Sequence, residues 1–417
     1  MEKYIINGGN KLVGETSVLG AKNSVLPILA ATVIGNNRST ILNIPNLRDV
    51  EIMEEILISL GCIVERVGNT IMVDSRTLNQ IVIPEDLVRE MRSSIILMGS
   101  MLSRTKEVVI TYPGGCEIGP RPIDLHLKAL RHMGAEIEES YGQLYCRTEG
   151  LMAADIQLDY PSVGATENII LAAVTAKGVT VIRNAAREPE IIDLQNYLNK
   201  SGARVSGAGT SVITIEGVKT FKDVTHTIIP DRIVAGTLMV TSAITGGDII
   251  LKNVIVDHLL SIIAKLRETG TQIYANENTI KVSGPKKLNS IEMLQTLPYP
   301  GFPTDMQAQM MALLSIAGGT SIICETVFEN RYKHAEELTR MGANIKILGR
   351  VAVVNGVKEL TGAKVTAKDL RGGAALTLAG LASKGATEIS QIFHIERGYE
   401  NLHIILQNLG ADIEKTN

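Results

Sequence analysis

One short pattern recurs six times along the chain and constrains its fold more than any other feature. Each copy reads as the end of a helix, a glycine and the start of a strand: SLGCIVE, HMGAEIE, KSGARVS, ETGTQIY, RMGANIK and NLGADIE. The marker glycines are Gly61, Gly134, Gly202, Gly270, Gly342 and Gly410, and successive ones lie 68 to 73 residues apart. Glycine readily takes the left-handed conformation that ends a helix. The regular spacing therefore predicts six similar structural units.

Each unit contains the same elements in the same order, opened by a short strand. In the first unit the sequence predicts an apolar helix over 22–35, a strand over 38–45, an amphipathic helix over 50–61 and strands over 62–67 and 70–75. The first helix is apolar nearly all round, which is typical of a buried helix, whereas the second is apolar at every third or fourth position. Alternating strands and helices predict an α/β fold with parallel and antiparallel pairing.

Six units divide most simply into two domains of three, because 417 residues are too many for one ordinary core. The boundary is expected near HTIIPDR, where Pro230 follows a strand that we assign to the opening of the fourth unit. The first domain then covers 22–229 and the second continues over 230–417. A cleft between two similar domains is a usual place for a ligand. An extended solenoid is disfavoured, because the repeats are long and lack capping units.

Composition excludes several classes of function. The net charge is −3 and aromatic residues make up 3%, with no basic block, so nothing indicates a nucleic-acid surface. There is no signal-peptide pattern and no apolar run long enough to span a bilayer, so we expect a cytoplasmic protein without membrane insertion. The 4 cysteines lack metal-binding spacing, which predicts no metal site and reduced thiols. The oligomeric state stays open.

Cations stand at the start of the buried helix in four of the six units: Lys22, Arg92, Arg232 and Arg371. The helix dipole opposes a cation there by about 0.3–1 kcal/mol, whereas a bound anion reverses the sign of that effect. These positions therefore indicate anion sites. Side chains that simply reach solvent are the open alternative.

A second set of cations lies in the loop between the second strand and the amphipathic helix. Five units carry an arginine there: Arg48, Arg121, Arg187, Arg331 and Arg397. A guanidinium group binds carboxylate or phosphate through two parallel hydrogen bonds. Together with the helix amino termini, these arginines predict a receptor for a small, highly charged ligand that bears phosphate and carboxylate.

The second unit differs from its siblings in this loop, PGGCEIGPRPIDLH, which alone carries a thiol, Cys116. Nearby arginines lower the pKa of a thiol from about 8.5 and make it a better nucleophile and proton donor. His126 either pairs with this thiol as a dyad or, as we favour, lies on the helix behind the loop. The other cysteines, Cys62, Cys146 and Cys324, are expected to be packing residues.

The fifth unit supplies a candidate carboxylate. Asp305, in PGFPTDMQAQ, occupies the first turn of the buried helix, where Thr and Asp are ordinary helix caps. Its position is equivalent to that of Lys22 and Arg371 in their units. This equivalence directs Asp305 toward the ligand.

Motifs spread over the whole chain resemble those of one enzyme family. They read GAKNSVLPILAA, YPGGCEIGPRPIDLH, SVGAT, NAAREPEIID, PDRI, FPTDMQAQ, ETVFENR, DLR and HIERGYE. Together they are similar to the enolpyruvyl transferase family, in its branch that acts on UDP-N-acetylglucosamine. The resemblance implies two inverse α/β barrels of three βαβαββ units each. It also implies that residues 1–21 belong with 230–417, and that the active site lies in the cleft between the barrels.

The resemblance implies a reaction as well. The enolpyruvyl group of phosphoenolpyruvate passes to the 3-hydroxyl of UDP-N-acetylglucosamine through a tetrahedral intermediate, with release of phosphate, in the first committed step of peptidoglycan synthesis. Small-molecule substrates are implied, with no cofactor and no metal. The thiol of Cys116 implies inactivation by the epoxide fosfomycin.

Residue roles follow from the resemblance at matching positions. Cys116 is implied to protonate the enol methylene and Asp305 to take the proton from the sugar hydroxyl, with Lys22 and Arg397 completing the catalytic set. Phosphoenolpyruvate is implied to contact Lys22, Asn23, Cys116, Arg121 and Arg397. The UDP-sugar is implied to contact Arg92, Arg121, Pro122, Ile123, Asp124, Leu125, Ser162, Val163, Gly164, Asp305 and Val327. The residues implied to line the closing cleft are Arg331, Asp369 and Arg371.

Two alternatives stay open. The sister enzyme, 5-enolpyruvylshikimate-3-phosphate synthase, shares the fold and the phosphoenolpyruvate chemistry but does not need the PGGC loop. A catalytically idle homologue that binds UDP-sugars as a regulator should have lost one of the catalytic residues, and all four are present. Tyr160 stands at a nucleotide-contact position where a lysine occurs in some members.

Overall fold

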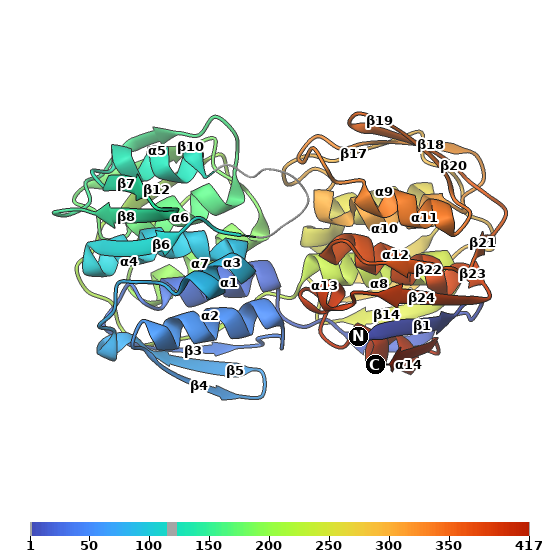
Figure 1. Cartoon of the computed structure of the whole chain (residues 1–417), viewed down its shortest axis with the longest axis horizontal. Helices are drawn as coiled ribbons and strands as arrows, with labels where there is room; N and C mark the ends of the chain where they lie inside the picture. The colour runs from blue at the N-terminus through green and yellow to red at the C-terminus, as the bar shows by residue number, and fades with distance from the viewer. Residues whose placement is uncertain (1, 115–122, 417) are drawn as a thin grey trace. The chain divides into compact units, whose positions relative to one another are not determined.

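The computed structural model describes residues 2–114 and 123–416, which form two compact units with separate hydrophobic cores (Figure 1). Within the described chain, the N-terminal unit comprises residues 20–114 and 123–229. The C-terminal unit comprises residues 2–19 and 230–416. Each unit contains three of the six marker glycines.

The N-terminal unit consists of three repeats, each with a small sheet, a buried helix and outer helices. The buried helices are α1 (Lys22–Ala31), α4 (Leu97–Thr105) and α6 (Val163–Ala173), and α4 follows the 3-10 turn Arg92–Ile96. The outer helices are α2 (Arg48–Ser59), α3 (Glu85–Glu90), α5 (Asp124–His132) and α7 (Pro189–Lys200). The sheets have the strand orders β13-β3-β5-β4, β6-β8-β7 and β11-β12-β10-β9. Their strands are β3 (Arg38–Leu42), β4 (Ile63–Val67), β5 (Thr70–Asp74), β6 (Glu107–Thr111), β7 (Glu136–Ser140), β8 (Gln143–Arg147), β9 (Asp155–Gln157), β10 (Val179–Arg183), β11 (Arg204–Ser206), β12 (Val212–Glu216) and β13 (Val224–Thr227).

The C-terminal unit repeats this plan. Its buried helices are α8 (Arg232–Thr245), α10 (Gln307–Leu314) and α12 (Leu370–Ala382), and the outer helices are α9 (Leu260–Glu268), α11 (Lys333–Arg340), α13 (Phe393–Glu396) and α14 (Leu402–Asn408). The sheets have the orders β15-β16-β14-β2, β17-β18-β20-β19, β22-β24-β1-β25 and β21-β23. Their strands are β1 (Lys3–Asn7), β2 (Val13–Ser17), β14 (Asp248–Lys252), β15 (Gln272–Asn276), β16 (Thr279–Ser283), β17 (Met293–Gln295), β18 (Thr320–Cys324), β19 (Asn344–Leu348), β20 (Val351–Asn355), β21 (Leu360–Thr361), β22 (Lys364–Thr366), β23 (Ser383–Lys384), β24 (Ala386–Ser390) and β25 (Asp412–Thr416).

The repeat pattern predicted from the marker glycines is confirmed. All six have positive φ, between 88° and 109°, and each directly follows the last residues of an outer helix. The predicted burial of the apolar helices is confirmed too: every residue of α10 is buried, and α8, α10 and α12 pack against one another. Apolar residues on all sides of these helices meet neighbouring helices and the sheets around them.

Each unit completes its first sheet with a strand from a distant part of the chain. β13 pairs in parallel with β3 of the first repeat, with Val224 opposite Ser39. β2 pairs in parallel with β14 of the fourth repeat, with Val13 opposite Asp248. The prediction that the strand before Pro230 opens the fourth unit is therefore wrong. Alternation along a strand shows which face is buried but does not identify the partner strand.

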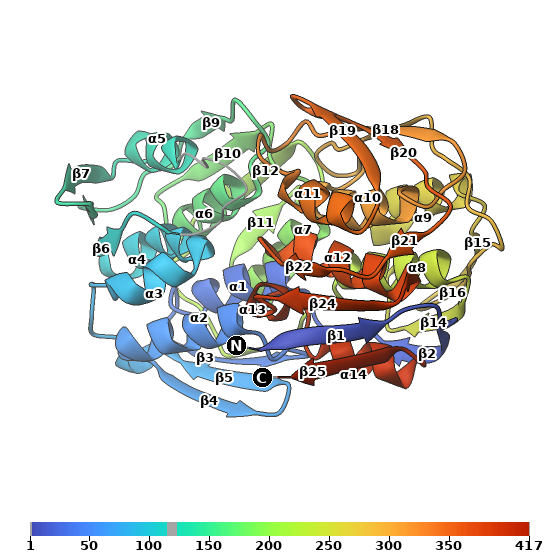
Figure 2. The ribbon, with the colours of Figure 1, turned by 45° about the vertical axis from the view of Figure 1, so that its right-hand side comes forward.

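The first strand of the chain completes the sixth repeat. β1 lies between β24 and β25 and is antiparallel to both, which places Lys3 opposite Ser390 and Thr416 (Figure 2). In the other five repeats this place in the sheet belongs to the last strand of the same repeat. The two ends of the described chain are therefore neighbours within one sheet.

None of the helices in the described part of the chain is both long and apolar enough to cross a membrane. No group of three or more His, Cys, Asp or Glu side chains in residues 2–114 and 123–416 is arranged to hold a metal ion.

Candidate active site

The predicted site residues come from both units, and most of those that the structure describes lie at the starts of buried or outer helices. Cys116, Arg121 and Pro122 lie outside the described residues. The remaining predicted residues are described below, unit by unit.

In the N-terminal unit, Lys22 begins α1 and forms an ion pair with Asp49 in the first turn of α2. Lys22 Nζ lies 2.6 Å from Asp49 Oδ2, and the two side chains are only 13% and 3% exposed. Asn23 follows Lys22 in the same turn and is half-buried. The carboxylate of Asp49 offsets the unfavourable placement of a cation at a helix amino terminus.

A buried carboxylate of α7 anchors the first turn of α1. Asp193 is 3% exposed and accepts a short hydrogen bond from Ser24 Oγ. The same oxygen, Oδ2, accepts the backbone N–H of Ile229 at 3.3 Å, and Oδ1 lies 2.8 Å from His226 Nε2. These bonds hold the start of α1, and with it Lys22, against α7 and the segment after β13.

His126 lies on α5, the helix on which it was expected, and is buried, whereas the loop around Cys116 lies outside the described residues. Asn168 Oδ1 accepts the backbone N–H of Gly99 at 2.7 Å, so its amide nitrogen faces Ile95 O at 3.1 Å and His126 Nδ1 at 2.9 Å. Nδ1 must therefore accept, and the neutral ring carries its proton on Nε2. Burial lowers the pKa of His126 to about 4, and the charge of Arg92 contributes in the same direction.

The implied UDP-sugar residues of this unit lie at the starts of α5 and α6. Ile123 is buried, Leu125 is half-buried and Asp124 is exposed. Ser162 caps α6 by accepting the backbone N–H of Ala165 at 3.3 Å, and Val163 and Gly164 form the first turn. A Cβ at Gly164 would lie 3.3 Å from His126 Cε1, so glycine permits this close approach of α5 and α6. Tyr160 is 41% exposed.

In the C-terminal unit, the structure brings two predicted residues, Arg331 and Arg371, to the carboxylate of Asp305. Asp305 lies in the 3-10 turn Thr304–Met306 directly before α10. Its Oδ1 accepts from Arg331 Nη2 at 2.6 Å and its Oδ2 from Arg371 Nη2 at 3.1 Å. The two arginines are 4% and 6% exposed, whereas the carboxylate is 26% exposed. Two guanidinium groups thus fix the carboxylate while part of it stays accessible.

Arg371 is held from several sides. Its guanidinium carbon lies 5.5 Å from the ring centroid of Tyr399, and its backbone N–H donates to Asp369 Oδ1 at 3.0 Å. Burial opposes the charged form of Arg371, but Asp305, Tyr399 and Asp231 together outweigh it, and the pKa of Arg371 is raised. The arginine therefore stays charged inside the unit.

Aspartates cap two of the helices that begin with a predicted cation. Asp369 accepts the N–H groups of Arg371 and Gly372 at the start of α12. Asp231 accepts those of Ile233 and Val234 at the start of α8, which Arg232 begins. With Asp49 beside Lys22, the protein itself supplies negative charge at three of the four helix starts. The dipole argument therefore does not by itself require a bound anion there.

The remaining predicted residues differ in their surroundings. Arg397 is half-buried at the end of α13, and Val327 lies in the loop after β18. Arg48 pairs with glutamates of α2 and α3, and Arg187 is exposed. Burial raises the pKa of Cys62 and Cys146 to about 12, which agrees with their predicted packing role, and Cys324 is half-buried.

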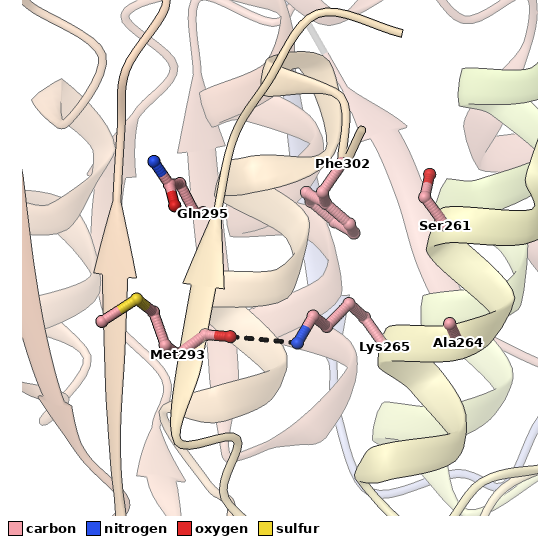
Figure 3. Close-up of a pocket in the computed structure, with 6 residues that line it drawn as sticks. All are labelled: Ser261, Ala264, Lys265, Met293, Gln295 and Phe302. Carbon is pink, nitrogen blue, oxygen red and sulfur yellow. Dashed lines mark hydrogen bonds between the residues drawn. The ribbon is translucent and has the colours of Figure 1, made fainter. Parts of the chain in front are cut away.

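A surface cavity of about 350 Å³ lies between α9 and β17 and contains none of the predicted site residues (Figure 3). It is lined by Ser261, Ala264, Lys265, Met293, Gln295 and Phe302. Lys265 Nζ donates to Met293 O at 3.0 Å, which links α9 to β17.

An equivalent cavity of about 280 Å³ lies between α5 and β9 in the N-terminal unit. Lys265 lies five residues before Gly270, and Ala129, which lines the second cavity, lies five residues before Gly134. Both cavities thus occur where an outer helix meets the opening strand of the next repeat. They are a property of the repeat, and only the second is lined by a predicted site residue, Leu125.

Comparison with solved structures defines the class of protein. The fold resembles that of the enolpyruvyl transferase NikO from Streptomyces tendae with a TM-score of 0.91 and 24% identity, over 100% of this chain and 99% of the other. EPSP synthase from Acinetobacter baumannii gives a TM-score of 0.80 and 18% identity over 100% of both chains. The fold is therefore that of the enolpyruvyl transferases, with inverse α/β barrel domains, as predicted.

The chain belongs to the EPSP synthase (3-phosphoshikimate 1-carboxyvinyltransferase) family, whose model matches residues 6–406. It is 55% identical over 413 residues to UDP-N-acetylglucosamine 1-carboxyvinyltransferase 2 of Caldanaerobacter subterraneus subsp. tengcongensis, covering 99% of both chains. It is 52% identical over 417 residues to UDP-N-acetylglucosamine 1-carboxyvinyltransferase 1 of Carboxydothermus hydrogenoformans, covering 100% of this chain and 99% of the other. These matches confirm the family resemblance seen in the motifs.

Sequence reasoning missed the acidic and amide residues that hold the predicted cations and acids in place. They are Asp49, Asn168, Asp193, Asp231 and Glu325. Most lie in helix first turns or just after strands, where such residues are common for local reasons. The sequence did contain one usable signal. An aspartate precedes the predicted cation at the start of α8, as Asp231-Arg232, and again at the start of α12, where one residue separates Asp369 from Arg371.

Proposed function

We propose that this chain transfers the enolpyruvyl group of phosphoenolpyruvate to the 3-hydroxyl of UDP-N-acetylglucosamine and releases phosphate, the first committed step of peptidoglycan synthesis. The observation that carries the proposal is the similarity to proteins named for this reaction, at 48–55% identity over nearly the whole of both chains. The substrates are small molecules.

Asp305 is the proposed base. A carboxylate that accepts the proton of the 3-hydroxyl makes the sugar oxygen a better nucleophile toward the enol carbon. Its contacts with Arg331 and Arg371 support this role, because they fix the carboxylate in one orientation while leaving it 26% exposed.

Cys116 is the proposed acid, which donates a proton to the methylene carbon of the enol. Lys22, Asn23, Arg121 and Arg397 are proposed to hold the phosphate and carboxylate of phosphoenolpyruvate. Addition gives a tetrahedral intermediate of high charge density, which fixed cations stabilise more than they stabilise the substrates. Elimination of phosphate then restores the double bond in the product.

The remaining implied residues complete the proposed substrate contacts. For the UDP-sugar they are Arg92, the run 121–125, Ser162, Val163, Gly164 and Val327, with Asp369 holding Arg371. These residues come from both units of the chain. The proposal therefore requires residues 22–229 together with residues 1–21 and 230–417 for activity.

One assay separates the candidate functions. Phosphate release from phosphoenolpyruvate is measured with UDP-N-acetylglucosamine or with shikimate 3-phosphate as the acceptor. We expect release with the UDP-sugar only. Release with shikimate 3-phosphate alone would show the sister reaction, after which the matching family is named. No release with either acceptor, together with binding of the UDP-sugar, would show a regulator.

A further inference from the structure

A buried carboxylate in the C-terminal unit forms no ion pair within the described part of the chain. Glu325 directly follows β18 and is 0% exposed. All of its partners are neutral donors. A buried charge without a cation is costly unless hydrogen bonds compensate it. Packing alone therefore does not explain why a glutamate occupies this position.

Four hydrogen bonds converge on Glu325. Oε1 accepts the backbone N–H groups of Val327 and Phe328 at 2.8 and 3.1 Å and the hydroxyl of Thr296 at 2.9 Å. Oε2 accepts the hydroxyl of Thr304 at 2.9 Å. One side chain therefore joins the loop after β18, the segment after β17 and the turn that begins at Thr304.

Two of these links lead to the predicted acid–base residue and its partner. Thr304 directly precedes Asp305 in the same 3-10 turn. Phe328 lies in the loop that leads to Arg331, and its ring centroid is 5.4 Å from the guanidinium carbon of Arg331. Glu325 thus connects both segments that meet in the 2.6 Å contact between Arg331 and Asp305.

The sibling repeats show that the fold itself does not need a carboxylate here. The residue directly after the second strand is Asn or Gln with φ between 54° and 63° in four repeats: Asn43, Asn184, Asn253 and Gln391. Each of the three asparagines donates from Nδ2 to a carbonyl just beyond the opening strand of its sheet. Glu325 has no positive φ and cannot donate as a carboxylate. The fifth repeat therefore replaces a structural amide with an acceptor that faces Thr304.

We propose that Glu325 is a positioning residue that sets the placement of Asp305 relative to Arg331. The proposal rests on the proposed function, in which Asp305 is the base. Removing the link frees the Asp305 turn without removing any group that touches a substrate. A displacement of about 1 Å at a reacting group lowers a rate by about 10²-fold.

The first test removes only the link to the Asp305 turn. In Thr304→Val we expect kcat to fall by about 10²-fold, with a smaller change in KM for UDP-N-acetylglucosamine. Thr304→Ser keeps the hydroxyl and should restore kcat to within about threefold of the parent, because the hydrogen bond re-forms. A Thr304→Ser variant as slow as Thr304→Val would overturn the proposal.

A matched control separates positioning from loss of stability. Thr269 of the same unit is 0% exposed, and its hydroxyl donates to Leu266 O at 2.7 Å, away from Glu325. We expect Thr269→Val to lower the denaturation midpoint as much as Thr304→Val does while leaving kcat unchanged. Equal losses of kcat in the two variants would show a general structural effect and contradict the proposal.

Substitution of the carboxylate itself gives a second comparison. In Glu325→Gln the amide oxygen can keep the bonds from Val327 and Phe328, and the amide nitrogen can donate to the hydroxyl of Thr304. We therefore expect Glu325→Gln to retain kcat within about tenfold, and Glu325→Ala to lose about 10²-fold. The proposal fails if Glu325→Ala, shown to be folded by its circular dichroism, retains the parent kcat.

A structural readout keeps the inference separate from the proposed reaction. In a crystal structure of Thr304→Val, we expect the contact between Arg331 Nη2 and Asp305 Oδ1 to be longer than 2.6 Å. An unchanged contact would overturn the positioning role, even in an active enzyme. If the parent chain releases phosphate with neither acceptor, the proposed function fails, and the crystal structure still decides whether Glu325 positions Asp305.

Discussion

At the scale of single residues, the candidate site depends on acids and amides that orient other side chains. Asp49 faces Lys22, Asp369 holds the backbone of Arg371, and Asn168 sets the tautomer of His126. Each of these partners is buried. The carboxylates of Asp49 and Asp369 accept charge-assisted hydrogen bonds, which are stronger than neutral ones, whereas the bond between Asn168 and His126 is neutral.

Replacing Asp305 by its amide tests the proposed base. Asp305→Asn keeps the shape of the side chain but cannot take the proton of the sugar hydroxyl, so we expect kcat to fall by about 10²–10⁴-fold. Initial rates of phosphate release at saturating substrate measure this. The exposed Asp257 of the same unit offers the control Asp257→Asn, which should behave as the parent. Activity within threefold of the parent in Asp305→Asn would rule out its role as the base.

The buried His126 predicts a loss of stability in acid. Its pKa is lowered to about 4 from 6.5, so between these values the unfolded chain binds a proton that the folded chain does not. Stability therefore falls as the pH falls through this window, by about 2 kcal/mol at pH 5. The denaturation midpoint should drop less between pH 7 and pH 5 in His126→Gln than in the parent. His334, whose pKa is also lowered to about 4, contributes equally to both proteins. Parallel pH profiles would contradict this assignment.

At the scale of elements, the marker glycines differ in how closely they are surrounded. Gly61 and Gly134 have nearly the same φ, 94° and 92°. A Cβ at Gly134 would meet nothing within 4 Å, whereas one at Gly61 would lie 2.7 Å from Asn79 Oδ1 and 3.0 Å from Thr77 O. A substitution at Gly134 therefore tests backbone strain alone, whereas a substitution at Gly61 tests backbone strain together with steric contact.

Alanine at these two glycines should destabilise the protein to different degrees. Gly134→Ala should cost about 1–2 kcal/mol of unfolding free energy, because an L-residue is strained at this φ. Gly61→Ala should cost more, since the new methyl also displaces neighbouring atoms. Denaturant unfolding of both variants measures the difference. Equal losses of unfolding free energy would show that the atoms around Gly61 move aside at no cost in stability.

Many of the helices and strands were predictable from the sequence, because they follow from local patterns of residues. The apolar character of α1 and the spacing of the marker glycines predicted burial and helix ends that the structure confirms. The partner of β13 was not predictable. β13 pairs with β3, about 185 residues earlier, and the alternation of residues along a strand does not identify its partner strand. The site residues Asp193 and Glu325 escaped notice for a similar reason: their partners lie on other elements.

At the scale of the whole molecule, the C-terminal unit depends on strands β1 and β2, which precede the N-terminal unit in the chain. β1 is an inner strand of the sheet β22-β24-β1-β25, with partners on both sides. Without it, β24 and β25 would each lose a neighbour and expose unpaired backbone groups.

Deletion of residues 1–8 should therefore destabilise the C-terminal unit selectively. Limited proteolysis followed by mass analysis should find early cleavage within residues 230–416, while residues 20–114 and 123–229 stay protected. The double substitution Lys3→Ala and Asn7→Ala keeps the backbone pairing of β1 and serves as the control. Equal protection of both units in the deletion variant would contradict an essential role of β1.

The pairing of β1 also orders events during synthesis. The N-terminal unit has all its strands once β13 emerges from the ribosome, whereas β1 must wait for β24 and β25, which begin at Ala386 and Asp412. At about 5–20 residues per second, that delay is about 20–80 s. The first strand of the chain is thus among the last to fold, and for that time an apolar segment with free edges depends on the nascent chain or on chaperones for protection from aggregation.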